Sequence, residues 1–265
     1  MTVASLLSLT TLIIAGSLDG ILSDAVYALA FIIPVSLGLL LDKRDPYEER
    51  DERLYLLPTG EGAALTLPCI LPTVAAVMLA SYLTSLLIKA TTGAVDSVNV
   101  GDDLLLAALR HAVMPAILEE ALYRYLPLKL FGRDAPRAAL ILSSVFFAFA
   151  HVSLFSIPYA LIAGAAFMLL DLIFESVLPS FILHLVNNIC SLLLIFYGDS
   201  QSFVVAAAIL FSLLLLLSLC FIIFRRKRYL ELIRDTFRGA EQREASYTPL
   251  LFIIPAAFIA LTEFL

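Results

Sequence analysis

Charged residues are scarce in this chain of 265 residues: 15% are Asp, Glu, Lys or Arg, whereas 61% are hydrophobic. A soluble domain carries about 25% charged residues, so the composition excludes an ordinary soluble protein and a disordered chain. The three cysteines all lie inside apolar runs, and their odd number argues against a disulfide framework. No Lys or Arg precedes Lys43, so the apolar N-terminus lacks the basic leader of a secretory signal and is expected to be a retained span.

Long apolar runs are abundant and predict an all-α fold, a polytopic transmembrane bundle of eight or nine spans. A spanning helix needs about 20 mostly apolar residues, and these runs are too long for the alternating strands of an outer-membrane barrel. The expected spans are 3–18, 25–41, 63–90, 104–126, 137–155, 157–175, 178–197, 202–224 and 249–264.

Basic residues are concentrated in three segments, and we expect these segments to be cytoplasmic because loops on that side are enriched in Lys and Arg. Loops without Lys or Arg alternate with them. The basic segments are 42–53, 129–137 and 225–243. The protein is accordingly expected to be a multi-pass protein of the cell membrane, in contact with the lipid bilayer.

Three regions are expected along the chain. Residues 1–103 would hold the N-terminal spans with a cytoplasmic loop at 42–62, and residues 104–198 a central membrane core. Residues 199–265 would hold the C-terminal spans with a basic linker at 225–247, in which residues 225–240 would form either a helix on the membrane surface or a plain linker helix. This basic cluster directly follows an apolar run, so nucleic acid is not an expected partner.

Strongly polar side chains inside the expected spans are concentrated in the middle third of the chain. A charge at the centre of a spanning helix costs about 2.5–3.5 kcal/mol, and such residues persist where they pair or take part in chemistry. They are Glu119, Glu120, Arg124, His151, Asp171, Glu175, His184, Asn187 and Asn188.

The acidic doublet is predicted to divide into two roles. Glu120 and Arg124 are four residues apart, so they share a helix face and can form a buried ion pair. Glu119 points elsewhere and is left without a local cation, which makes it a candidate general base or acid. The alternative is that both glutamates reach the membrane interface.

The histidines occur in two further segments. His151 ends an apolar helix, one turn after Phe147, and a hairpin through 132–136 would bring it to the depth of Glu119. His184 and Asn188 share a face and can both donate hydrogen bonds, although such pairs also join helices without chemistry. The expected boundaries place His184 on the order of 12 Å shallower than His151, at 1.5 Å per residue. Tilt or a re-entrant 176–180 segment would have to close this gap.

These segments resemble the CAAX protease and bacteriocin-processing (CPBP) family of intramembrane proteases, whose motifs are EExxxR, FxxxH and HxxxN. The chain has Glu119–Arg124 as EEALYR, Phe147–His151 as FAFAH and His184–Asn188 as HLVNN, in the family's order. The matching core runs from about Pro115 to Cys190.

The resemblance implies a glutamate-dependent endopeptidase that cleaves a membrane protein or peptide without a cofactor. Glu119 and His151 would activate water, and His184 and Asn188 would stabilise the oxyanion. Glu120 and Arg124 would hold the geometry.

Three alternatives stay open. A zinc-dependent variant would bind the metal through Glu119, His151 and His184. A non-catalytic immunity or scaffold protein could bind a peptide in the same cavity. A proton-linked transporter could extend its relay through Asp171 and Glu175, which we otherwise expect to be an exposed pair near the cytoplasmic side.

Overall fold

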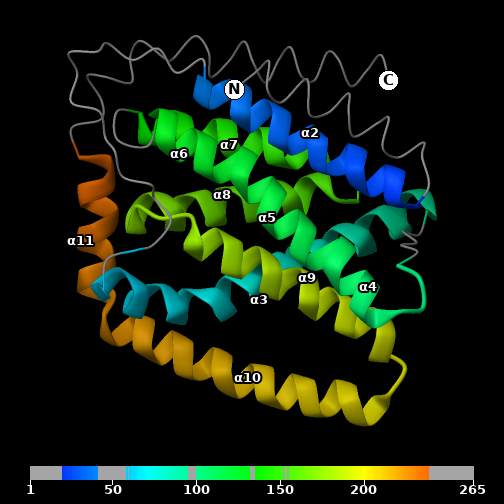
Figure 1. Cartoon of the computed structure of the whole chain (residues 1–265). Helices are drawn as coiled ribbons and strands as arrows, with labels where there is room; N and C mark the ends of the chain where they lie inside the picture. Colours follow the sequence, from blue (N-terminus) through cyan, green and yellow to red (C-terminus); the bar gives the residue numbers. More distant parts are fainter. Residues whose placement is uncertain are drawn as a thin grey trace.

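The computed structural model describes residues 20–40, 58, 60–94, 100–131, 135–151, 153 and 155–238, and these are helical apart from short connections. The helices pack side by side as a bundle, with α11 running across the ends of the others (Figure 1). They are α2 (Gly20–Leu40), α3 (Gly60–Thr92), α4 (Leu104–Ala108), η1 (Leu109–Val113), α5 (Met114–Glu120), η2 (Ala121–Tyr125), α6 (Leu126–Phe131), α7 (Pro136–Ala150), α8 (Ile157–Phe174), α9 (Leu178–Tyr197), α10 (Gln201–Phe224) and α11 (Arg226–Phe237).

The all-helical prediction is confirmed for the described residues, which contain no strand. Five helices of this part are long and apolar enough to cross a membrane: α2, α3, α8, α9 and α10. The protein is therefore an integral membrane protein. Along α10 no side chain is buried, as expected for a helix that faces lipid.

The predicted count of eight or nine spans is not confirmed. The expected span at 104–126 is a helical run from α4 to α6 that contains two π-helical stretches, η1 and η2. The expected span at 137–155 ends early, because α7 has 15 residues. The expected spans at 3–18 and 249–264, and the basic loop at 42–53, lie outside the described residues.

The centre of the bundle is the close packing of α7 against α8. Gly164 of α8 faces the backbone of α7, and a Cβ atom placed on it would lie 2.9 Å from the Cα of Ser144. Small residues of this kind let two membrane helices approach closely. This contact fixes α7, which carries Phe147 and leads into His151.

Replacing Gly164 by Ala is expected to destabilise the protein. The new methyl group would meet backbone rather than a movable side chain, and overpacking of this kind costs about 1–3 kcal/mol. Thermal unfolding in detergent should show a lowered midpoint. The matched control is Ala206→Val on α10, an exposed position where added bulk meets no core. An unchanged midpoint for Gly164→Ala would contradict the close packing.

The basic segment at 225–238 folds back onto the start of α3. Arg228 binds Glu61 through two nitrogens, at 3.1 and 2.8 Å, and Tyr229 donates a hydrogen bond to the Leu65 carbonyl at 2.7 Å. Tyr229 also packs on the core cluster that contains Leu65 and Phe174. Both predicted forms were helical, and α11 is a helix that packs on the ends of α3 and α8.

A tight turn joins α8 to α9. Glu175 adopts a left-handed conformation (φ 48°), and α9 begins three residues later. The backbone amide of Ser180, in the first turn of α9, donates to the Asp171 carboxylate at 3.0 Å. Both residues are fully buried, so α9 starts at a depth where it is already surrounded by protein.

Candidate active site

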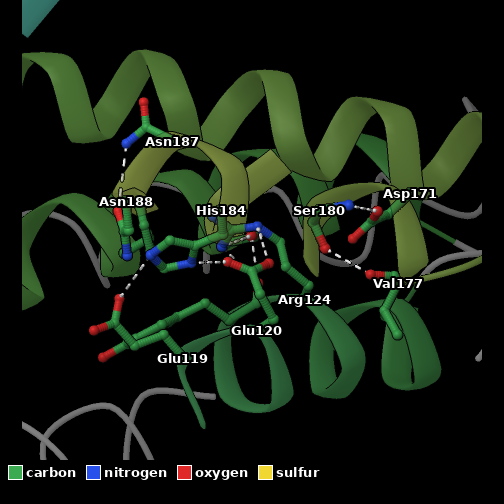
Figure 2. Close-up of polar contacts among 12 residues, drawn as sticks. Glu119, Glu120, Arg124, Asp171, Val177, Ser180, His184, Asn187 and Asn188 are labelled. Carbon is green, nitrogen blue, oxygen red and sulfur yellow. Dashed lines mark hydrogen bonds and ion pairs between the residues drawn. The ribbon is translucent and has the colours of Figure 1, made fainter. Parts of the chain in front are cut away.

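The acidic doublet lies at the junction of α5 and η2, and its two carboxylates have different partners (Figure 2). Glu120 is buried and lies between a histidine and an arginine: its Oε1 is 2.7 Å from His184 Nδ1, and its Oε2 is 3.3 Å from Arg124 Nε. The predicted ion pair of Glu120 with Arg124 is therefore confirmed. Glu120 has a second partner, His184. The spacing of residues along one helix could not indicate this contact, because His184 lies on another helix.

Arg124 is completely buried, and several groups compensate its charge besides Glu120. Its Nη1 donates hydrogen bonds to the Tyr123 carbonyl and to Ser143 Oγ, at 3.2 and 3.1 Å. Its guanidinium also lies over the Phe147 ring, 4.3 Å from the ring centre, where the π face attracts a cation. Ser143 and the aromatic ring thus join α7 to the doublet.

Glu119 faces away from Arg124, as the spacing predicted. Its Oε1 accepts a hydrogen bond of 2.6 Å from the Tyr27 hydroxyl, and its Oε2 lies 4.0 Å from His184 Nε2. The side chain is 14% exposed, against 4% for Glu120. Glu119 is thus the more accessible carboxylate of the doublet, on the opposite edge of the imidazole that binds Glu120.

His184 lies between the two carboxylates (Figure 2). Because a carboxylate only accepts, Nδ1 must carry the hydrogen in the bond to Glu120. The orientation of the imidazole is thereby set, and Nε2 points toward Glu119. Such a carboxylate partner on one ring nitrogen is a common way to fix what the other nitrogen can do.

His151 follows the last residue of α7, and its orientation is also set by one ring nitrogen. Nδ1 lies 2.8 Å from the Phe147 carbonyl, which can only accept, so Nε2 is left for another partner. The Phe147 ring lies edge-on to both imidazoles, 4.8 Å from His151 and 5.8 Å from His184 between ring centres. The predicted depth gap between the histidines is therefore wrong, because α9 starts inside the protein beside Asp171.

A cavity of about 420 Å³ connects these groups. Its lining includes His151, His184, Asn187 and Asn188, together with His111 of η1. Glu119 does not line it and approaches it only through His184, and neither a hydrogen bond nor an ion pair joins Glu119 to His151, both of which are described. The structure thus brings three of the four predicted catalytic side chains to one cavity, with Glu119 beside it.

Two residues near the site differ from what the sequence indicated. Asp171 was expected to be exposed with Glu175, but it is completely buried and binds the first turn of α9, whereas Glu175 is exposed. The cause is the tight turn at Glu175, which folds α9 back over Asp171. Tyr27 was not expected near the site. The sequence signal that could have indicated it is its position three residues after Asp24, on the same face of a mostly apolar helix.

The residues described do not include a group of three His, Cys, Asp or Glu side chains arranged to hold a metal ion. For the zinc variant, Glu119, His151 and His184 would have to converge. His184 has Nδ1 on Glu120 and His151 has Nδ1 on a carbonyl oxygen, so in each imidazole Nε2 is the nitrogen that a metal would use.

Comparison with known proteins supports the family resemblance that the three motifs indicated. Residues 101–190 match a family model described as type II CAAX prenyl endopeptidase Rce1-like. No curated protein and no solved structure matches the chain. The matched segment contains all three motifs and ends at Cys190, where the resemblance also ends. Helices α4 to α9 of this integral membrane protein thus carry the site, and most of their length lies in the segment that matches the Rce1-like family model.

Proposed function

We propose that the chain is an intramembrane endopeptidase of the cell membrane, in which Glu119 activates water for attack on a peptide bond. The observation that carries the proposal is the division of the doublet by one imidazole: Glu120 binds Nδ1 of His184, while Glu119 faces Nε2. One carboxylate is thus used for structure, and the other is available to accept a proton.

In the proposed reaction, the water oxygen bonds to the carbonyl carbon of the scissile peptide while one water proton passes to Glu119. His151 Nε2 accepts a hydrogen bond from the same water, because Nδ1 is already bound to the Phe147 carbonyl. The carbonyl oxygen becomes an oxyanion, which accepts hydrogen bonds from the Asn188 amide and from Nε2–H of His184 in its imidazolium form, whose Nδ1–H is bound to Glu120. The carbon–nitrogen bond then breaks, and the proton on Glu119 passes to the leaving amine.

The substrate is proposed to be a protein or peptide that is held in the membrane. The matched family is named for prenylated CAAX substrates, so a farnesylated peptide with a CAAX-type C-terminus is the first substrate to test. The full chain, reconstituted in liposomes, should release a C-terminal fragment that mass spectrometry detects. Binding without any cleavage would favour the non-catalytic scaffold, and proton-coupled uptake into the liposomes would favour the transporter.

Cleavage is expected to be independent of metal. Treatment with a chelator should leave kcat unchanged, and elemental analysis of the purified protein should show much less than one zinc per chain. Activity that is lost on chelation and restored by stoichiometric zinc would establish the variant that uses Glu119, His151 and His184 as ligands.

A further inference from the structure

Helix α2 contributes to the site although it lies outside the matched residues 101–190. The hydroxyl of Tyr27 lies 2.6 Å from Glu119 Oε1, a contact between residues 92 positions apart. A phenol donates one hydrogen, and here the acceptor is a carboxylate, so the bond is of the charge-assisted kind when Glu119 is ionised. We propose that Tyr27 is a positioning residue for Glu119, an inference that rests on the proposed function.

The bond leaves Glu119 with one occupied and one available oxygen. Oε1 is bound to Tyr27, whereas Oε2 is directed at His184 Nε2 on the cavity side. A carboxylate without the first contact could rotate about its last side-chain torsion, which has a broad energy profile. Tyr27 therefore selects the orientation in which Oε2 can meet the water.

The Tyr27 ring is itself held by a chain of aromatic contacts. Its centre is 5.0 Å from the buried Phe31 ring, which lies edge-on to Tyr123 at 6.1 Å. Tyr123 lies edge-on to Phe147 at 5.8 Å, and Phe147 contacts both imidazoles. Edge-to-face contacts of this kind fix ring orientation, so the phenol and the two histidines belong to one packed unit.

A second contact anchors α2 one turn earlier. Arg110 of η1 binds a single carboxylate oxygen of Asp24 through Nε and Nη2, at 3.0 and 2.8 Å. Asp24 and Tyr27 are three residues apart and share a helix face. The face of α2 that binds the matched region thus has one ion pair for attachment and one phenol for Glu119.

The test compares Tyr27→Phe with wild type in liposomes, under the conditions that reveal cleavage. Loss of the hydroxyl should lower kcat about tenfold, within the range for a misplaced reacting group, while KM and the unfolding temperature stay unchanged. Because a merely structural role would lower stability instead, the split between kcat and KM identifies positioning. Incorporation of 3-fluorotyrosine at position 27, which keeps the donor, should restore kcat.

The matched control is Tyr197→Phe, which removes a hydroxyl from the exposed end of α9, and it should have wild-type kcat. Glu119→Gln, measured in the same assay, separates this inference from the proposed function. If Glu119→Gln is inactive and Tyr27→Phe has wild-type kcat, the positioning role is overturned while the protease reading stands. If Glu119→Gln cleaves at the wild-type rate, the proposed function itself fails.

Discussion

Glu119→Gln is expected to abolish cleavage while leaving the protein folded. The amide is nearly the same size as the carboxylate and can still meet the Tyr27 hydroxyl through its oxygen, but it cannot take a proton from water. General-base catalysis contributes about 10²–10⁴-fold, so kcat should fall by at least 100-fold. The measurement is cleavage of a membrane-anchored peptide by the reconstituted variant, together with its thermal unfolding.

The matched control for this variant is Glu231→Gln on α11. Glu231 is exposed, forms an ion pair with Arg228 at 3.6 Å, and is far along the chain from the doublet. It should retain wild-type kcat, which would show that loss of a carboxylate alone does not matter. A Glu119→Gln variant with normal kcat would contradict the assignment of Glu119 as the base.

Arg124→Ala is expected to have the largest effect on stability. The substitution would leave the buried Glu120 carboxylate without its cation and would remove the guanidinium over the Phe147 ring. Breaking a buried ion pair by removing one partner costs about 3–5 kcal/mol. Folded yield and the midpoint of thermal unfolding should both fall. Cleavage should fall as well, because Arg124 would no longer hold Glu120, the partner of His184, in place.

Two further variants test the cause of this loss. Arg238→Ala removes an arginine at the exposed end of α11, where its side chain is 79% exposed, and should leave stability unchanged. Glu120→Gln combined with Arg124→Met removes both charges and should recover part of the lost stability, since no uncompensated charge remains. Normal yield and full turnover for Arg124→Ala would contradict the role of this ion pair.

The division of the doublet could be predicted from the sequence because it depends on local spacing. Glu120 and Arg124 are four apart, and they pair even though η2 is π-helical at this point. The four-residue spacing of His184 and Asn188 also predicted that they share a helix face, and both line the cavity. The contact between Glu120 and His184 could not be foreseen, because it depends on how α9 packs against α5.

The depth of His184 shows why helix counting fails in this fold. Counting along the spans at 137–155 and 178–197 assumes that both helices start at the same membrane surface. Here α9 begins in the buried interior, where Ser180 binds the Asp171 carboxylate. The same turn explains the wrong expectation for Asp171, since the sequence placed it near the end of a helix without showing that α9 covers it.

Tyr27 was missed for a different reason. Its partner Glu119 is 92 residues away, on a helix of the matched segment. Tyrosine is common at the ends of membrane helices, so its presence in an apolar run did not indicate a site. The ion pair of Asp24 with Arg110, which attaches α2 to the site, likewise joins residues far apart in the sequence.

Isotope transfer in a single turnover tests the central claim most directly. The reconstituted chain, in excess over peptide, is mixed with substrate in water enriched in ¹⁸O, and the product is analysed by mass spectrometry. If Glu119 activates water, the new C-terminal carboxylate carries one ¹⁸O atom and Glu119 stays unlabelled. An unlabelled product, with ¹⁸O in the Glu119 side chain, would show that Glu119 attacks the peptide itself and would contradict the account.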